Sequence, residues 1–222
     1  MLKNSVDIVS RNLLLIVLLA VLIFLNSPLY TLIPKPTLLF KLLNIVIYQV
    51  LACGILSSLW QYSREGRYDF VKGIKDNFLR YLGADILLGI VILVPMGFVL
   101  ILSKGSLSGR EFIQTPKIQL LTLIYLILTG PLIVFVNSYV FTKRKGLDAV
   151  LDGILYIKKN YKNTSAIGAA FSYSVVSSLL NMLGKITWFS GAKISLLFII
   201  SFITAYLMGL SFIAVSFTIN KE

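Results

Sequence analysis

Long apolar segments separated by short charged loops are the feature that most constrains this chain. A helix needs about 20 residues to cross the hydrocarbon core of a bilayer, and six segments approach or reach that length. A segment such as LLLIVLLAVLIFL does not alternate in polarity as a membrane β-strand would. Helices and closed barrels are the structures that satisfy their own backbone polar groups in lipid. We therefore predict an all-α integral membrane protein, with six transmembrane helices at residues 13–33, 38–60, 81–102, 120–141, 164–183 and 194–217.

The composition agrees with this prediction. The chain is 57% hydrophobic and 14% charged, whereas soluble globular chains are about a quarter charged. The first apolar segment is followed by NSPLYTLIPKP, which lacks the small-residue cleavage site of a signal peptide. We expect it to be retained as a transmembrane helix. The single cysteine, Cys53, lies inside the second segment and indicates nothing about disulfides.

Positive residues are distributed unevenly between the two sides of these predicted spans. With the N-terminus inside, fourteen of the 21 Lys and Arg residues lie on the cytoplasmic side, the side on which basic loops are retained. We predict a multi-pass protein of the plasma (inner) membrane with both termini in the cytoplasm. Because the net charge of +12 comes from loops beside spans, it indicates anionic lipid headgroups and not nucleic acid. The basic residues expected to face lipid or a partner protein are Arg64, Arg67, Lys72, Lys75, Lys143, Arg144, Lys145, Lys158 and Lys159.

Three amphipathic stretches precede the first, third and fifth predicted spans. In the third stretch, residues 147–159, an apolar stripe recurs at helical spacing and consists of Leu147, Val150, Leu151, Ile154 and Leu155. Thirteen residues would extend only about 20 Å as a helix, too short to cross the membrane. We expect each stretch to be a cytoplasmic helix in the membrane plane, and a basic-plus-Asn step to mark the turn into the span. The single domain, 1–222, then divides into three hairpin units: 1–60, 61–141 and 142–222.

This three-hairpin pattern resembles a known family. Units two and three share an Asn-aromatic step, Asn77–Phe78 and Asn160–Tyr161, whereas unit one has Asn-Leu. The pattern is similar to the membrane domain fused to some bacterial glycerophosphodiester phosphodiesterases and to its stand-alone relatives. The resemblance covers nearly the whole chain and implies a fold and a membrane location. It implies no catalytic residues, because the remaining loops are too short for a phosphodiesterase domain.

Residues that carry catalysis are scarce. The chain has no histidine, which excludes HExxH zinc sites and Ser-His or Cys-His nucleophile pairs. One cysteine rules out a CxxC motif, and no Walker-type glycine loop is present. Asp148 and Asp152 lie one helical turn apart, without the further pattern expected of a lipid-headgroup transferase. We therefore predict no enzyme activity, no cofactor and no metal site.

Polar residues inside the predicted spans carry more functional weight, because burying them in lipid is costly. Asp85 and Asn137 are placed at similar depths in the third and fourth spans and are expected to form a hydrogen bond, while Gln49 lies near the middle of the second span. They are either a polar site or ordinary interhelical contacts. Pro95 and Pro131 interrupt the third and fourth spans, either as simple kinks or as the edges of a transport cavity.

Small residues recur every fourth position in the last two predicted spans. Ala170, Ser174 and Ser178 form one stripe. Ser201, Ala205 and Gly209 form the other. Small side chains let helix backbones approach closely, so we predict that both stripes face protein.

The sequence supports three functional classes. The leading prediction is a non-catalytic membrane protein, either an accessory or scaffold component or the membrane subunit of a transport assembly, whose partners are anionic lipids and a soluble or membrane protein. The alternative is a self-contained transporter of small molecules or lipids, with a cavity between the third and fourth spans. The third is a membrane-embedded lipid-modifying enzyme.

Overall fold

The computed structural model describes residues 2–26, 37–103, 116–159, 164–184 and 191–221. Over these ranges the chain forms helices and no strands. The helices are α1 Leu2–Arg11, α2 Leu13–Asn26, α4 Leu38–Glu65, α5 Phe70–Ser103, α7 Pro116–Thr142, α8 Asp148–Lys159, α9 Thr164–Gly184 and α10 Gly191–Asn220. The prediction of an all-α protein is confirmed.

Four of these helices are long and apolar enough to cross a membrane. They contain the segments Leu42–Glu65, Phe70–Phe98, Ile118–Thr142 and Ser195–Asn220. The pair α1 and α2 passes the same test together but is bent by 83°, and α9 contains a shorter apolar stretch, Ser165–Leu180. The described residues thus contain four helices that could span a membrane, or up to five if the bent pair counts as one span. This is the architecture of a membrane protein, with fewer clear spans than the six expected.

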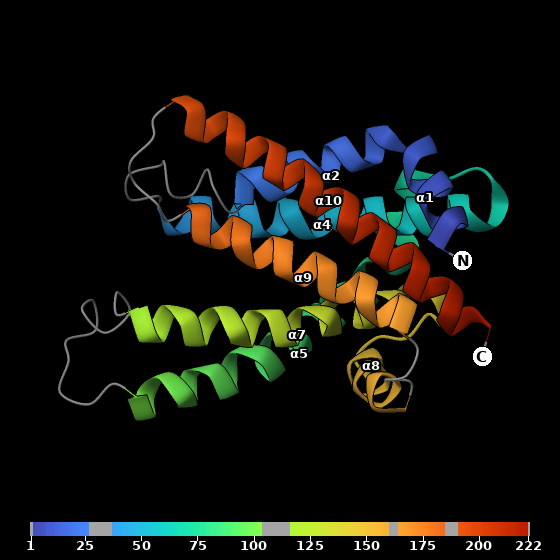
Figure 1. The fold of residues 1–222 in the computed structure, drawn as a ribbon. Coiled ribbons are helices and arrows are strands. Elements are labelled where there is room, and N and C mark those ends of the chain that lie inside the picture. Colours follow the sequence, from blue (N-terminus) through green and yellow to red (C-terminus); the bar gives the residue numbers. More distant parts are fainter. Residues whose placement is uncertain (1, 27–36, 104–115, 160–163, 185–190, 222) are drawn as a thin grey trace.

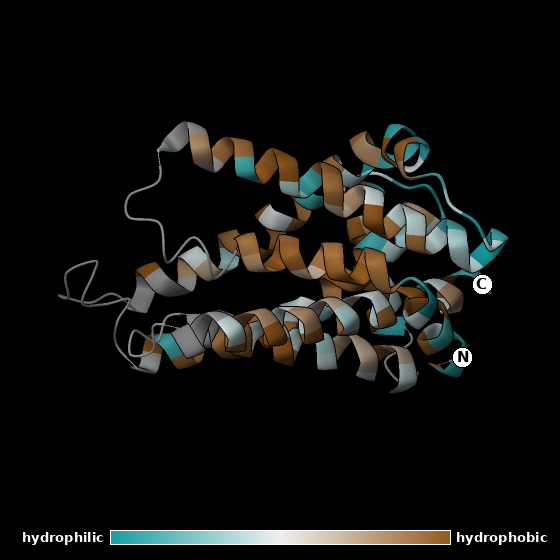
Figure 2. Cartoon of the chain, turned by 90° about the horizontal axis from the view of Figure 1, so that it is seen from above, coloured by the Kyte–Doolittle hydropathy of each residue, from teal (hydrophilic) through white to brown (hydrophobic). Residues whose placement is uncertain are grey.

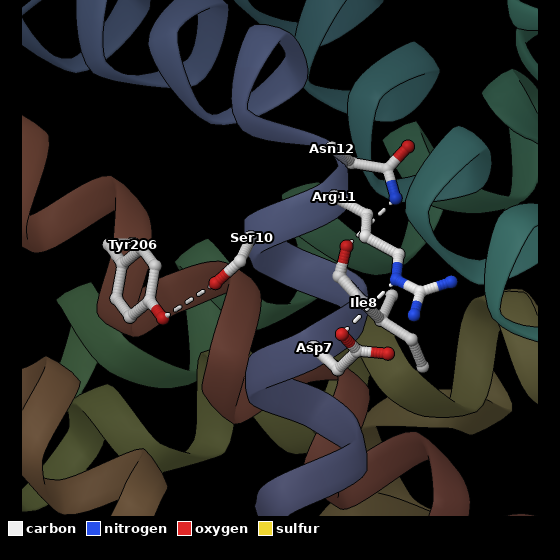
Figure 3. A network of polar contacts seen from close by, with 6 residues as sticks. All are labelled: Asp7, Ile8, Ser10, Arg11, Asn12 and Tyr206. Atoms are coloured by element: carbon white, nitrogen blue, oxygen red, sulfur yellow. Dashed lines mark hydrogen bonds and ion pairs between the residues drawn. The ribbon is translucent and has the colours of Figure 1, made fainter.

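The bend between α1 and α2 occurs at Asn12. The Asn12 side-chain amide turns back and donates to the carbonyl oxygen of Ile8 at 2.8 Å, which also accepts the Asn12 backbone N–H at 3.2 Å (Figure 3). On the outer side of α1, the Arg11 Nε lies 3.1 Å from the Asp7 Oδ1 (Figure 3). The Ser10 and Tyr206 hydroxyls are 3.4 Å apart and connect α1 to α10 (Figure 3). The expected turn at the basic-plus-Asn step is therefore observed in the first unit.

The second unit differs from this expectation. Residues 70–80 do not form a separate helix in the membrane plane, because α5 continues without interruption from Phe70 to Ser103. Nothing in this stretch breaks a helix. The Asn77 amide donates to the Gly73 carbonyl oxygen at 3.1 Å, within its own helix. Asn77 therefore lies within a continuous helix, and the predicted turn before the third span is wrong.

Caps define the boundary between α4 and α5. Gly66 ends α4 with a φ of 68°, a left-handed conformation that glycine adopts without a steric penalty. Asp69 then starts α5, because its Oδ1 accepts a hydrogen bond from the Lys72 N–H at 2.9 Å. Farther along, α4 and α5 cross at Gly73, where an added Cβ would come within 2.6 Å of the Ser57 Oγ. This hairpin depends on a glycine at the crossing.

The helix α10 lies at the centre of the bundle. It packs against α9, α2, α7, α4 and α1 (Figure 1). Its side chains Phe212 and Ile213 are fully buried, and Phe212 meets Phe141 of α7 edge to face with ring centroids 5.7 Å apart. Exposed apolar side chains lie on the outer helices, for example Leu93 and Leu128, and also on the first half of α10, for example Ile199. A closely packed interior together with an apolar exterior is expected for a bundle that lies in lipid.

One end of the molecule is distinctly polar. Both termini lie at this end (Figure 1), and hydrophilic residues gather there (Figure 2). The helix α8 is also at this end and is seen end-on, across the direction of α7 and α9 (Figure 1). We call this the basic end, because it carries α8 with Lys158 and Lys159, the α7–α8 turn with Lys143–Lys145, and the α4–α5 turn with Arg64 and Arg67.

Candidate functional site

A polar pair connects α4 and α5 inside their spanning segments. The Gln49 Nε2 donates to the Asp85 Oδ2 at 2.5 Å, and both side chains are partly buried. The Gln49 Oε1 is buried and has no hydrogen-bond partner in the described part of the chain. A carboxylate with one amide donor is an unusual group to hold at this depth.

Asn137 does not take part in this pair. It is buried on α7 with 3% of its surface exposed, and the described residues give no hydrogen bond between it and Asp85. The expected Asp85–Asn137 bond is therefore replaced by Gln49–Asp85, which joins helices that are consecutive in the chain. All three residues are recognisable in the sequence as polar side chains within apolar segments. Asp85 and Asn137 were paired because they lie at similar depths, but depth does not reveal which way a helix is rotated.

Tyrosines near Asp85 were missed by the sequence analysis. Tyr48 of α4 and Tyr81 of α5 lie within electrostatic range of the Asp85 carboxyl. Tyr173 of α9 interacts with both of these tyrosines. Two of the three had a signal in the sequence, because Tyr48 adjoins Gln49 and Tyr81 lies one helical turn before Asp85. Two tyrosines, one from each of the helices that carry the polar pair, thus lie near the Asp85 carboxyl.

A side chain from a neighbouring helix donates a hydrogen bond at the point where Pro131 interrupts α7. Proline has no N–H, so the carbonyl of residue 127 loses its helical donor. The Ser174 Oγ of α9 lies 2.9 Å from the Ile127 O and 3.0 Å from the Leu126 O. Gly130 allows this approach, because an added Cβ would overlap the Ser174 side chain. Pro131 therefore serves helix packing at this point.

Pro95 of α5 lies near a similar contact. The Tyr125 hydroxyl of α7 donates to the carbonyl oxygen of Ile92 at 2.6 Å, three residues before the proline. Both proline-containing helices thus have a side-chain donor from a neighbour beside the break. This is a common way for membrane helices to accommodate proline.

Both small-residue stripes face protein, as predicted. Ala170, Ser174 and Ser178 of α9 are each at most 3% exposed. Ser201 and Ala205 of α10 are fully buried, and Gly209 is buried against Ile16, Leu59 and Val9. These stripes contribute to packing and do not line a site.

The basic residues at the basic end fall into two groups. Arg64, Arg67, Lys72 and Arg144 line a polar groove of about 400 Å³. The others are exposed, and consist of Lys75, Lys143, Lys145, Lys158 and Lys159. Lys145 makes an ion pair with Asp152 at 2.5 Å, and this contact raises the pKa of the Lys145 ammonium. The pair therefore stabilises α8 below the ordinary lysine pKa, and its contribution is lost as the pH rises through the raised value.

The helix α8 has three distinct faces. Ala149, Val150, Gly153 and Tyr156 are buried against the bundle, mainly on α7. Asp148 and Lys159 are exposed on a polar face, whereas Lys158 is exposed at the end of the helix, one turn after Ile154. The third face, which we call the leucine face, is apolar yet 40–62% exposed and consists of Leu147, Leu151, Ile154 and Leu155. Of the predicted apolar stripe, Val150 is the one fully buried side chain, and the other four remain largely exposed.

The described residues contain no cluster of three or more side chains of the types that bind metal ions. Comparison with protein-family models, with curated proteins and with solved structures gives no match. The resemblance to the phosphodiesterase-associated membrane domain therefore stays a prediction.

Proposed function

We propose that this chain is a non-catalytic, multi-pass protein of the plasma membrane, an accessory component or the membrane subunit of a transport assembly. The six spans would be α2, α4, α5, α7, α9 and α10. Support for α9 comes from its packing between α7 and α10, and α2 likewise packs on α4 and α10. A helix held between two spanning helices lies in the same layer as they do. The helices α1 and α8 would lie at the cytoplasmic surface.

The observation that carries this proposal is the composition of the basic end. The leucine face of α8 points away from the protein, and Lys145, Lys158 and Lys159 lie on or beside the same helix. An exposed apolar face with adjacent lysines is typical of helices that lie in the lipid interface. Anionic headgroups attract such lysines by about 1 kcal/mol each. The basic end would then face the cytoplasm and bind anionic lipid, which leaves it positioned to receive a partner protein.

Lipid quenching of a tryptophan tests this proposal. Leu155→Trp, made with Trp60→Phe and Trp188→Phe, places a single fluorophore on the leucine face. In nanodiscs, brominated phosphatidylcholine should quench it, and brominated phosphatidylglycerol at the same mole fraction should quench it more strongly. Lys145→Gln, Lys158→Gln and Lys159→Gln together should remove the difference between the two lipids and leave the first quenching intact. Absence of quenching by either lipid would contradict the proposal.

The Gln49–Asp85 pair favours one second candidate, a transporter. A carboxyl held in the spans with a tyrosine environment is the kind of group that carries protons in transport proteins. Proteoliposomes that acidify along an imposed potential with Asp85 present, but not with Asp85→Asn, would favour transport over the accessory role.

A further inference from the structure

The groove at the basic end is built from two consecutive helices and the end of a third. Its walls are the last turns of α4, the α4–α5 turn, the start of α5 and the residues after α7. Four basic and three acidic side chains line it, which leaves one net positive charge. In the described part of the chain the ion pairs are Arg11–Asp7 and Lys145–Asp152. Arg64, Arg67, Lys72 and Arg144 therefore line a concave surface without a carboxylate partner.

Hydrogen bonds hold the floor and one wall of the groove in place. The Asn77 Nδ2 donates to the Ser57 Oγ at 3.1 Å, which joins α5 to α4. The Gln61 Oε1 accepts from the Asp69 N–H at 3.0 Å. On the wall, the Arg64 guanidinium carbon lies 5.9 Å from the centre of the Trp60 ring, a cation–π arrangement that orients the charged group. The groove is thus formed before any ligand arrives.

Arg144 supplies a second, independent observation. Its φ is 53°, and among the described residues it is the one non-glycine residue with a positive φ. A residue with a long side chain rarely has a positive φ, and backbone strain of this kind is concentrated at ligand-binding positions. Here the positive φ occurs at Arg144, whose charged side chain lines the groove. A glycine would fit the same backbone without strain, so the arginine has to be explained by its side chain.

We propose that this groove binds a phosphate group that carries one negative charge, held by Arg67, Lys72 and Arg144. Arginine matches the oxygen atoms of phosphate with paired donors, and one net positive charge suits one negative charge. Trp60 and Tyr68 also line the groove, as aromatic residues do at the depth of lipid headgroups. The source is either a phospholipid headgroup or free phosphate. The inference rests on the proposed function only in placing this end at the cytoplasmic surface.

Fluorescence of Trp60 measures this binding directly. Trp188→Phe leaves Trp60 as the single tryptophan, and it lies in the groove wall. The purified full chain would be titrated in detergent with dihexanoyl phosphatidylglycerol and, separately, with inorganic phosphate at a pH where the monoanion dominates. We expect a saturable change in fluorescence. Arg67→Gln and Lys72→Gln should each raise the half-saturating concentration by about tenfold.

Two further variants give the test its controls. Lys221→Gln removes the same charge from an exposed position after α10, outside the groove, and should leave the half-saturating concentration unchanged. Arg144→Gly removes a cation and relieves the positive φ, so it should weaken binding by about tenfold without lowering the unfolding midpoint. A purely structural role for Arg144 would not separate binding from stability in this way.

Saturation by the lipid alone identifies a headgroup, and saturation by both ligands shows that phosphate itself suffices. Saturation by neither ligand, or an equal effect of Lys221→Gln and Arg67→Gln, overturns the inference. The quenching at position 155 is measured separately, so a failure of the groove is distinguishable from a failure of the lipid-facing basic end.

Discussion

At the scale of single residues, Ser174 is the side chain whose role can be tested most directly. Its hydroxyl contacts the Ile127 carbonyl that Pro131 leaves without a donor. Ser174→Ala should destabilise the protein by about 1 kcal/mol, because that carbonyl is then buried without a partner. Unfolding by sodium dodecyl sulfate in mixed micelles measures the loss. Ser172→Ala is the matched control, because Ser172 is exposed and bonds within its own helix to Gly168.

The proline itself supplies the second half of this test. Pro131→Ala restores an N–H at position 131 that can reach the Ile127 carbonyl. In that background Ser174→Ala should cost less than in the parent chain. Equal costs in both backgrounds would show that Ser174 is not compensating for the proline.

The Gln49–Asp85 pair predicts a different pattern of mutational effects. Gln49→Leu or Asp85→Leu alone should destabilise by about 1–3 kcal/mol, since each leaves the partner buried and unsatisfied. The double substitution should cost much less than the sum, because both polar groups are then gone. The same unfolding assay, with Asn137→Leu combined with Asp85→Leu as the control, reads this coupling. Coupling to Asn137 and not to Gln49 would contradict the structure.

At the scale of elements, the crossing of α4 and α5 depends on Gly73. Gly73→Ala should destabilise by about 1–3 kcal/mol, because the new methyl group meets the buried Ser57 side chain. Gly89→Ala, in the same helix, meets nothing within 4 Å and should be neutral or stabilising, since alanine favours helix by about 1 kcal/mol. A thermal unfolding comparison of the two variants separates packing from helix propensity. Equal effects would contradict a close crossing at Gly73.

The helices themselves were predictable from the sequence, and their contacts were not. Apolar length predicted α4, α5, α7 and α10, and helical periodicity predicted α8. The bends were harder, because the same kind of residue acts in two ways. The side-chain amides of Asn12 and Asn77 both donate to the carbonyl oxygen four residues earlier, yet the chain bends at Asn12 and α5 continues through Asn77. The side-chain bond is therefore the same at both positions, and the Asn alone does not predict whether the chain turns.

The same limit applies to the candidate sites. Asp85 and Gln49 were recognisable from the sequence as polar residues in apolar segments, but such segments do not reveal helix rotation. The groove was harder still, because its lining comes from two stretches of the chain, residues 57–77 and 141–144, whose first and last residues are 87 positions apart. The basic residues were predicted to face lipid or a partner. That four of them share a concave surface follows from the fold alone.

At the scale of the whole molecule, the bundle consists of a body with an apolar exterior and a single basic end. Both termini, α8 and the groove occupy that end (Figures 1 and 2). The central helix α10 connects α1 at this end with α2, α9 and α7 along its length. Every polar feature that we propose to act outside the bundle is therefore on one surface, while the Gln49–Asp85 pair is a separate, internal feature.

The topology of the molecule leads to the final prediction. Cys53 is the single cysteine in the chain, so Cys53→Ala gives a background without thiols. Into it we would introduce Lys145→Cys, Lys159→Cys or, in the predicted external loop, Ser108→Cys. A membrane-impermeant maleimide should label only Ser108→Cys in intact cells. It should label the other two in inverted vesicles, because basic loops resist translocation.

Each departure from this pattern has a defined meaning. Labelling of Lys145→Cys and Lys159→Cys from outside would invert the proposed orientation and place the groove on the external surface. Labelling of Ser108→Cys from the same side as Lys145→Cys would mean that α7 does not cross the membrane. Its length and hydropathy make that outcome costly, because α7 has an apolar segment of 25 residues, more than the roughly 20 that a crossing needs. Labelling of positions 108 and 145 from opposite sides would therefore fix the direction of α7, and with it the side of the membrane on which the basic end lies.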